Sequence, residues 1–140
     1  SARGAVGVMQ LLPATAAGKP INITGIEKNP ELNIKAGVRY LKHLRDTYIN
    51  DPGISERNRT LMAFAAYNAG PGNLRAFRQI AKDSGLNPNI WFNNVELGAA
   101  KKVGRETVQY VSNIYKYFIS YQLILQRSQV QENARGSNMK

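Results

Sequence analysis

The sequence has no cysteine, a single histidine and no long apolar run, and each absence narrows what the protein can be. Without cysteine there is no disulfide, no thiolate metal site and no thiol nucleophile. His43 lies between Lys42 and Leu44 on the polar side of a predicted helix, so we interpret it as a surface residue and expect no metal site. No apolar stretch approaches the roughly 18 residues that span a bilayer. No metal or organic cofactor is therefore expected.

Strand patterns are equally scarce, and helical periodicity dominates the 140 residues. The sequence predicts an all-α domain over residues 1–126, followed by a frayed C-terminal tail at 127–140. Pro13 marks the start of, or a bend in, the first helix. Helices are expected near residues 5–17, 33–49, 55–69, 71–83 and 105–126, with a long loop at 18–31 and an irregular stretch around Trp91.

Two of these helices carry specific expectations about which residues are buried. Asn33 is a good N-cap residue for the second helix, and Ile34, Val38 and Tyr48 recur at the spacing of an apolar helix face. In residues 105–126 the apolar positions cover more than one face, which predicts a central, mostly enclosed helix.

The net charge of +10 comes from 19 Lys and Arg against 9 Asp and Glu. Such a surface attracts polyanions, namely nucleic acid, anionic lipid or acidic cell-wall polymers. The basic residues are scattered over several predicted helices without a known reader motif, so nucleic-acid binding is not expected. They include Lys42, Arg45, Arg57, Arg59, Arg75, Arg78, Lys101 and Lys102.

Three short stretches place polar or aromatic groups beside a predicted break in the helical backbone, where side chains can line a cleft. They are "SARGAVGVMQ" at residues 1–10, "AAYNAGPGN" at 65–73 and "GRETVQYV" at 104–111. The small residues of the first stretch allow a tight turn and a close approach to the backbone.

Each of these residues also has a purely structural interpretation. Met9 can fill a gap in the core, and Gln10 can satisfy nearby backbone groups. Asn68 can end its helix in a left-handed conformation beside a packed tyrosine. Glu106 can stabilise the N-terminus of a helix through its charge, with Tyr110 as its neighbour one turn later.

Taken together, the three stretches resemble the motifs of the soluble lytic transglycosylase (SLT) domain, whose fold is similar to goose lysozyme. Ser1 and residues 4–10 match the family's serine followed by G-A-x-G-[LV]-M-Q. Residues 66–70 match A-Y-N-A-G, residues 106–111 match E-T-x-x-Y-V, and residues 37–41 match G-x-x-Y-L. The segment "GLNPNIWFNN" further resembles the membrane-bound, F-type branch of the family.

The resemblance implies cleavage of peptidoglycan between N-acetylmuramic acid and N-acetylglucosamine without water, leaving a 1,6-anhydro end. In the family the catalytic glutamate belongs to an E-S pair on a helix before the serine that aligns with Ser1, so no residue of this chain is expected to be the catalytic acid. The expected fold is a lysozyme-like, goose-type domain missing its N-terminal acid-bearing helix. An uncovered apolar surface should result, seen as a gap, a dimer or a folded-back tail.

The resemblance also implies roles for the quoted residues. Ser1 and Gln10 would hydrogen-bond the sugar, Met9 would form an apolar wall, and Tyr67 would lie close to the acid. The expected substrate-binding residues are Ser1, Met9, Gln10, Tyr67, Asn68, Glu106 and Tyr110.

The partner implied by the resemblance is the peptidoglycan glycan strand of the bacterial cell envelope, in the periplasm or associated with the outer membrane. Membrane association would depend on parts outside this chain. The alternative is a peptidoglycan-binding module that keeps the groove without catalysis.

Overall fold

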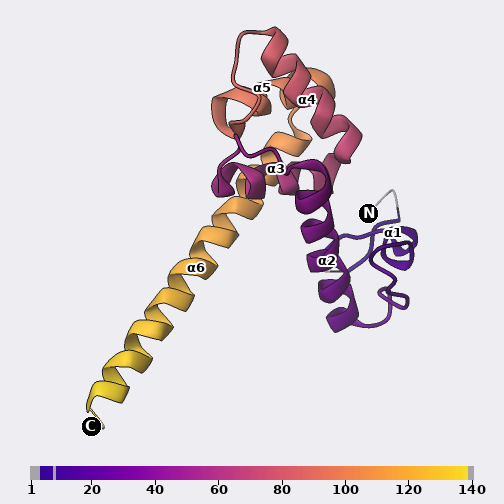
Figure 1. Cartoon of the computed structure of the whole chain (residues 1–140). Helices are drawn as coiled ribbons and strands as arrows, with labels where there is room; N and C mark the ends of the chain where they lie inside the picture. Colours follow the sequence, from indigo (N-terminus) through magenta and orange to yellow (C-terminus); the bar gives the residue numbers. More distant parts are fainter. Residues whose placement is uncertain (1–3, 8, 139–140) are drawn as a thin grey trace.

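The computed structural model describes residues 4–7 and 9–138, and within them the chain is helical without a sheet (Figure 1). An isolated antiparallel bridge joins Val6 and Leu11. The prediction of an all-α fold is confirmed. The elements are α1 (Pro13–Ala17), α2 (Pro30–Tyr48), α3 (Glu56–Ala69), α4 (Pro71–Asp83), a short kinked segment η1 (Trp91–Val95), α5 (Glu96–Val103) and α6 (Glu106–Asn138).

The N-terminal segment forms a turn where a helix was predicted from residue 5. Gly4 and Gly7 have φ of 84° and 73°, and Gln10 has φ of 48°. A right-handed helix cannot pass through these left-handed positions. Pro13 is the first residue of α1, as one of the two predicted alternatives has it.

Helix α2 begins one turn earlier than predicted. Asn29, not Asn33, is its N-cap, and the Asn29 side chain accepts hydrogen bonds from the backbone N–H groups of Glu31 and Leu32 at 3.0 and 3.3 Å. Pro30 occupies the first helical position, where its missing N–H costs nothing. Asn33 therefore lies inside the helix, where its side chain is buried.

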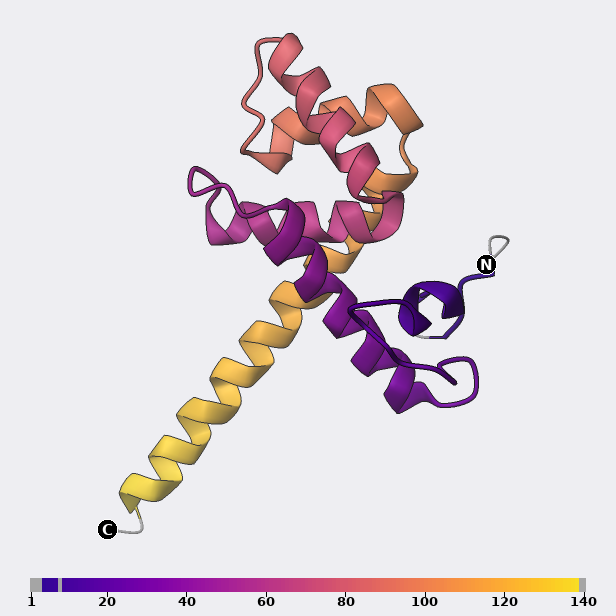
Figure 2. The ribbon, with the colours of Figure 1, turned by 45° about the vertical axis from the view of Figure 1, so that its right-hand side comes forward.

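The buried face of α2 also differs from the predicted one. Ile34 and Val38 are 45% and 56% exposed, and Tyr48 is exposed as well. The residues that face inward are of mixed size, and the N-terminal segment lies along this side of the helix (Figure 2). The buried residues of α2 are Asn33, Ala36, Gly37 and Leu44.

Helices α3 and α4 form where the sequence predicts them. The Ser55 side chain caps α3, whose residues 61–66 are all buried. Gly70, with φ of 93°, ends α3, and Pro71 begins α4. The α3–α4 corner is therefore fixed by local sequence signals. Trp91 is fully buried in the core that these helices share.

Helix α6 is packed only at its beginning. Thr107 and Val111 are buried, whereas every side chain from Ile119 to residue 137 is exposed. The second half of the helix extends away from the rest of the chain in both views (Figures 1 and 2). The predicted enclosure is wrong for this half, and the helix continues to Asn138 where a frayed tail was predicted from residue 127.

Large apolar side chains are exposed on several helices. They include Ile34 and Val38 on α2, Leu97 on α5, and Tyr117, Tyr121, Leu123, Ile124 and Val130 on α6. That part of this surface is uncovered by a missing helix stays a prediction. The tail does not fold back over this surface in the described part of the chain. Over the same residues, no helix is both long enough and apolar enough to cross a membrane.

Candidate functional site

The N-terminal turn is closed by its own backbone. The N–H of Val6 donates to the carbonyl of Leu11 at 3.0 Å, and the reverse bond measures 3.2 Å. Gln10 lies at the tip in a left-handed conformation, and its side-chain Nε2 donates to the Gly7 carbonyl at 2.9 Å. Such strained positions are often found at binding sites, and here the hydrogen bond to Gly7 fixes the direction of the Gln10 side chain.

Asn33 attaches this turn to α2. Its side chain is fully buried, and its Oδ1 accepts a hydrogen bond from the Met9 N–H while its Nδ2 donates to the Val6 carbonyl, each at 2.9 Å. A Cβ at Gly7 would lie 2.5 Å from Cγ of Asn33, so only glycine fits there. Gly37, one turn further along α2, is equally constrained, because a Cβ there would lie 2.7 Å from Cε of Met9.

Tyr67 attaches the same turn to α3. Its hydroxyl donates to the Met9 carbonyl at 2.6 Å, and its ring packs against Tyr40 with centroids 5.4 Å apart. Met9 is thus held through its N–H, its carbonyl and its side chain. That side chain packs on Gly37 and does not line the cleft described next, where the sequence predicted an apolar wall.

A cleft of roughly 630 Å³ opens between this turn, α1, α2, the end of α3 and the start of α6. Five of the predicted residues line it together, namely Gln10, Tyr67, Asn68, Glu106 and Tyr110. Ser1, also predicted, lies outside the described residues. The remaining lining residues are Ala5, Leu11, Leu12, Thr15, Tyr40, Ala69 and Gly70.

Sequence reasoning missed Tyr40, Leu12 and Thr15 as lining residues. The signal for Tyr40 was present, since it is the tyrosine of the G-x-x-Y-L motif at residues 37–41. Leu12 and Thr15 gave no such signal, because they reach the cleft only through the turn that places α1 beside it.

Asn68 joins two of the three motifs. The hydroxyl of Thr107, which is buried, donates to Oδ1 of Asn68 at 2.8 Å and ties the end of α3 to the start of α6. The left-handed conformation that ends α3 belongs to Gly70, so the predicted helix-ending role of Asn68 is wrong. Asn68 instead sets the distance between the two helices at the floor of the cleft.

Glu106 is the first residue of α6, and its side chain is exposed. A carboxylate there is stabilised by the helix N-terminus, as the structural interpretation holds. The same carboxylate also lines the cleft, where it can accept hydrogen bonds from a ligand. The two roles are compatible in this position.

Burial raises the pKa of three tyrosines around the cleft, Tyr40, Tyr67 and Tyr110, above the ordinary value of 10.0. The effect on the pKa is strongest for Tyr67, where loss of solvation is the main cause and the nearby Tyr110 and Tyr40 add to it. All three hydroxyls are therefore neutral at physiological pH and can donate hydrogen bonds.

The cleft combines phenol hydroxyls, amides, aromatic faces and a single carboxylate. Glu106 is the one acidic residue that lines it, so a pair of carboxylates of the kind used by most glycosidases is absent from its described lining. No group of three or more His, Asp or Glu side chains able to hold a metal occurs in the described residues. This chemistry suits a ligand rich in hydroxyl and amide groups.

Comparisons with known proteins agree on one family. A model of the "Transglycosylase SLT domain" matches residues 1–90. Proteins called "Membrane-bound lytic murein transglycosylase F" are similar to this chain: that of Histophilus somni (strain 2336) is 38% identical over 133 residues, covering 86% of this chain and 27% of that protein. That of Desulfosudis oleivorans is 36% identical over 132 residues, with 82% and 27% covered. The chain thus spans about a quarter of the length of these curated relatives.

Replacing Asn33 by alanine tests the attachment of the turn. The Asn33→Ala variant leaves the buried Met9 N–H without its partner and removes one of the two hydrogen bonds that the Val6 carbonyl accepts, the other coming from the Leu11 N–H. This loss should lower the free energy of unfolding by about 2 kcal/mol in urea denaturation. Asn113→Ala, at an exposed position of α6, is the matched control and should change it by less than about 0.5 kcal/mol. Equal effects of the two substitutions would contradict the assigned role.

The tyrosine titration tests the burial of the cleft. Because the pKa values of Tyr40, Tyr67 and Tyr110 are raised in the folded state, their neutral forms add stability below pH 10 that is lost as the pH rises through the folded-state pKa. Phenolate absorbance should therefore show a late phase above pH 10, and Tyr67→Phe should remove amplitude only from that phase. A single transition near pH 10 for all tyrosines would show that the cleft is not formed.

Proposed function

The chain belongs to the Transglycosylase SLT domain family, and on that basis we propose that it is the peptidoglycan-cleaving domain of a lytic transglycosylase. The observation that carries the proposal is the shared cleft, in which Gln10, Tyr67 and Glu106 from three distant sequence motifs lie together. The relatives whose names specify lytic murein transglycosylase support the same substrate.

The proposed reaction breaks the β-1,4 bond between N-acetylmuramic acid and N-acetylglucosamine. A glutamic acid gives its proton to the glycosidic oxygen, which leaves as the 4-hydroxyl of N-acetylglucosamine. The same group, now a base, takes the proton of the muramyl 6-hydroxyl as that oxygen bonds to the anomeric carbon. No water is consumed, and a 1,6-anhydro ring results.

One protein carboxylate suffices for this reaction, because substrate groups replace the second carboxylate of ordinary glycosidases. The absence of a carboxylate pair in the described lining of the cleft agrees with this route. The family resemblance assigns the acid to a glutamate upstream of Ser1 in the full-length protein. Glu106 is exposed, so we assign it to hydrogen bonding with sugar hydroxyls instead.

The residues around the cleft take different parts in binding. The Gln10 side chain, whose Nε2 donates a hydrogen bond to the Gly7 carbonyl, presents its amide to the sugar. The neutral hydroxyl of Tyr110 donates a hydrogen bond to the sugar as well. Tyr67 is a positioning residue, because its hydroxyl is engaged by the Met9 carbonyl. Met9 supports the turn from behind, and Ser1 is assigned a hydrogen bond to the sugar.

The site of action is the bacterial cell envelope, where the murein substrate of the relatives is found. We place it in the periplasm or at the outer membrane, with membrane attachment through parts outside this chain. The charge of +10 favours binding to an anionic cell wall. A dimer formed through the uncovered faces of α2 and α6 is a further proposal.

A second candidate is a peptidoglycan-binding module without catalysis. The observation in its favour is that the only carboxylate lining the described cleft, that of Glu106, is exposed. This module would bind the glycan in the same cleft and leave it intact.

Digestion of purified sacculi by the full-length protein separates these candidates. We expect 1,6-anhydro-muropeptides by mass spectrometry, and the Gln10→Ala variant should lower the initial rate about tenfold through loss of its hydrogen bond. Gln122→Ala, at an exposed position of α6, should leave the rate unchanged. Hydrated reducing ends would instead indicate a muramidase, and sacculus binding without any product would indicate the binding module.

A further inference from the structure

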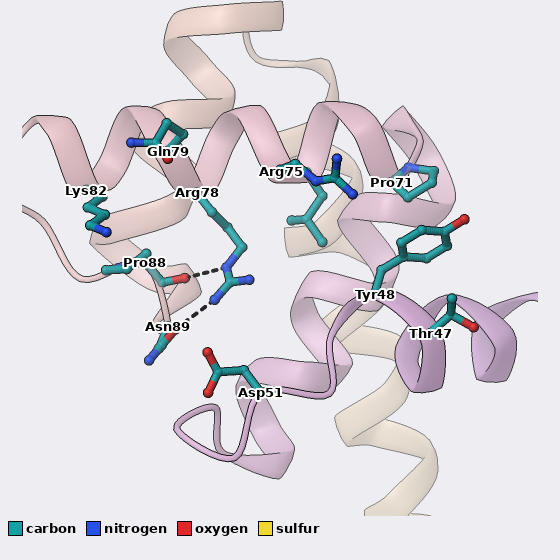
Figure 3. Close-up of a pocket in the computed structure, with 11 residues that line it drawn as sticks. Thr47, Tyr48, Asp51, Pro71, Arg75, Arg78, Gln79, Lys82, Pro88 and Asn89 are labelled. Carbon is teal, nitrogen blue, oxygen red and sulfur yellow. Dashed lines mark hydrogen bonds between the residues drawn. The ribbon is translucent and has the colours of Figure 1, made fainter.

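A second cavity of roughly 470 Å³ lies between the end of α2, the turn at Asp51, one side of α4 and residues 88–89 (Figure 3). Arg75, Arg78 and Lys82 line it from α4, where spacings of three and four residues place them on the same face. We refer to this cavity as the basic pocket. Asp51 lies across the cavity from this face (Figure 3).

The three cations of the basic pocket form no ion pair in the described part of the chain. Arg78 is nevertheless held in place, because its Nε donates to the Pro88 carbonyl and its Nη2 to Oδ1 of Asn89, both at 2.8 Å. The remaining N–H groups of the Arg78 guanidinium are available to an anion, and the two hydrogen bonds already fix the orientation of the guanidinium.

The single carboxylate of the pocket restricts which anion fits. Oδ1 of Asp51 accepts the N–H of Gly53 at 2.8 Å, which keeps the charge in place. The three cations attract any anion, but only a ligand that carries an ammonium group beside separate carboxylates can also use Asp51 and so match both ends. Hydroxyls of Thr47 and Tyr48 and the amide of Gln79 can satisfy peptide groups between these charges.

The basic pocket adjoins the cleft lined by Gln10, Tyr67 and Glu106, which we call the glycan cleft. Gly70 lines the cleft and the next residue, Pro71, lines the pocket. Along α2, Tyr40 lines the cleft and Thr47 the pocket, which at 1.5 Å per residue are about 10 Å apart. An extended peptide of about three residues covers this distance. A peptide attached to a sugar in the cleft can therefore reach the edge of the basic pocket at Thr47.

We propose that the basic pocket binds a short peptide that carries carboxylates and one ammonium group and is attached to the glycan strand in the cleft. The carboxylates lie against Arg75, Arg78 and Lys82, and the ammonium group lies against Asp51. The domain then prefers strands whose muramyl residues bear peptides. This inference rests on the proposed function for the identity of the strand, but the pocket itself can be tested separately.

Calorimetric titration of the chain with two probes tests the proposal. The peptide probe is N-acetyl-Ala-Glu-Lys-Ala with a free carboxyl end, and the glycan probe is a tetramer of N-acetylglucosamine. The double variant R75Q/K82Q should bind the peptide at least tenfold more weakly and the tetramer unchanged. Both residues are exposed, so the fold should tolerate the change, and K101Q/K102Q on α5 removes the same charge elsewhere as the matched control.

A further pair of measurements isolates Asp51. Replacing the lysine of the probe by glutamine should weaken binding severalfold to the unmodified chain and have no effect on the Asp51→Asn variant. An asparagine at this position keeps an oxygen for the Gly53 N–H, so the turn is preserved.

The outcomes separate this proposal from the proposed function. Peptide binding that R75Q/K82Q weakens, together with no binding of the tetramer, would support the pocket and contradict the proposed glycan cleft. Absence of peptide binding, equal loss in K101Q/K102Q, or displacement of the peptide by inorganic phosphate at equal concentration would overturn the pocket proposal while leaving glycan binding in the cleft unaffected.

Discussion

The attachment of one residue, Met9, to two helices is the constraint on which the cleft depends. Its N–H is bound by Asn33 of α2, its carbonyl by Tyr67 of α3, and its side chain packs on Gly37. The bridge between Val6 and Leu11 closes the N-terminal turn, but so short a turn, with Gly4 and Gly7 in it, is too costly in conformational entropy to stay ordered by itself. The bonds to α2 and α3 hold the turn against the helices, and they place Gln10 in the same cleft as Glu106.

The parts of the fold that sequence reasoning predicted correctly are those with local causes. Ser55, Gly70 and Pro71 fix the ends of α3 and α4 within a few residues, and an apolar run such as 61–66 can only be buried. The errors arose where distant contacts decide. Nothing near Asn33 reveals that its amide pairs with a backbone 24 and 27 residues away, and the buried face of α2 is set by what packs on Gly37. The candidate site was predicted from motifs rather than from periodicity.

The two cavities differ in their electrostatic character. The glycan cleft is lined by neutral donors and acceptors with one carboxylate, which suits the hydroxyl and N-acetyl groups of a sugar. The basic pocket gathers three cations on α4 that no described carboxylate pairs with. A strand of amino sugars bearing charged peptides presents both kinds of group, and our proposals assign the sugars to the cleft and the peptides to the basic pocket.

A crystal structure of the chain with an N-acetylglucosamine tetramer tests the central claim most directly. The account predicts a sugar ring between Gln10, Tyr67 and Glu106, with the hydrogen bonds from Met9 to Asn33 and Tyr67 retained in the complex. A tetramer bound elsewhere on the surface, or a turn at residues 4–11 released from Asn33 when the sugar binds, would contradict it.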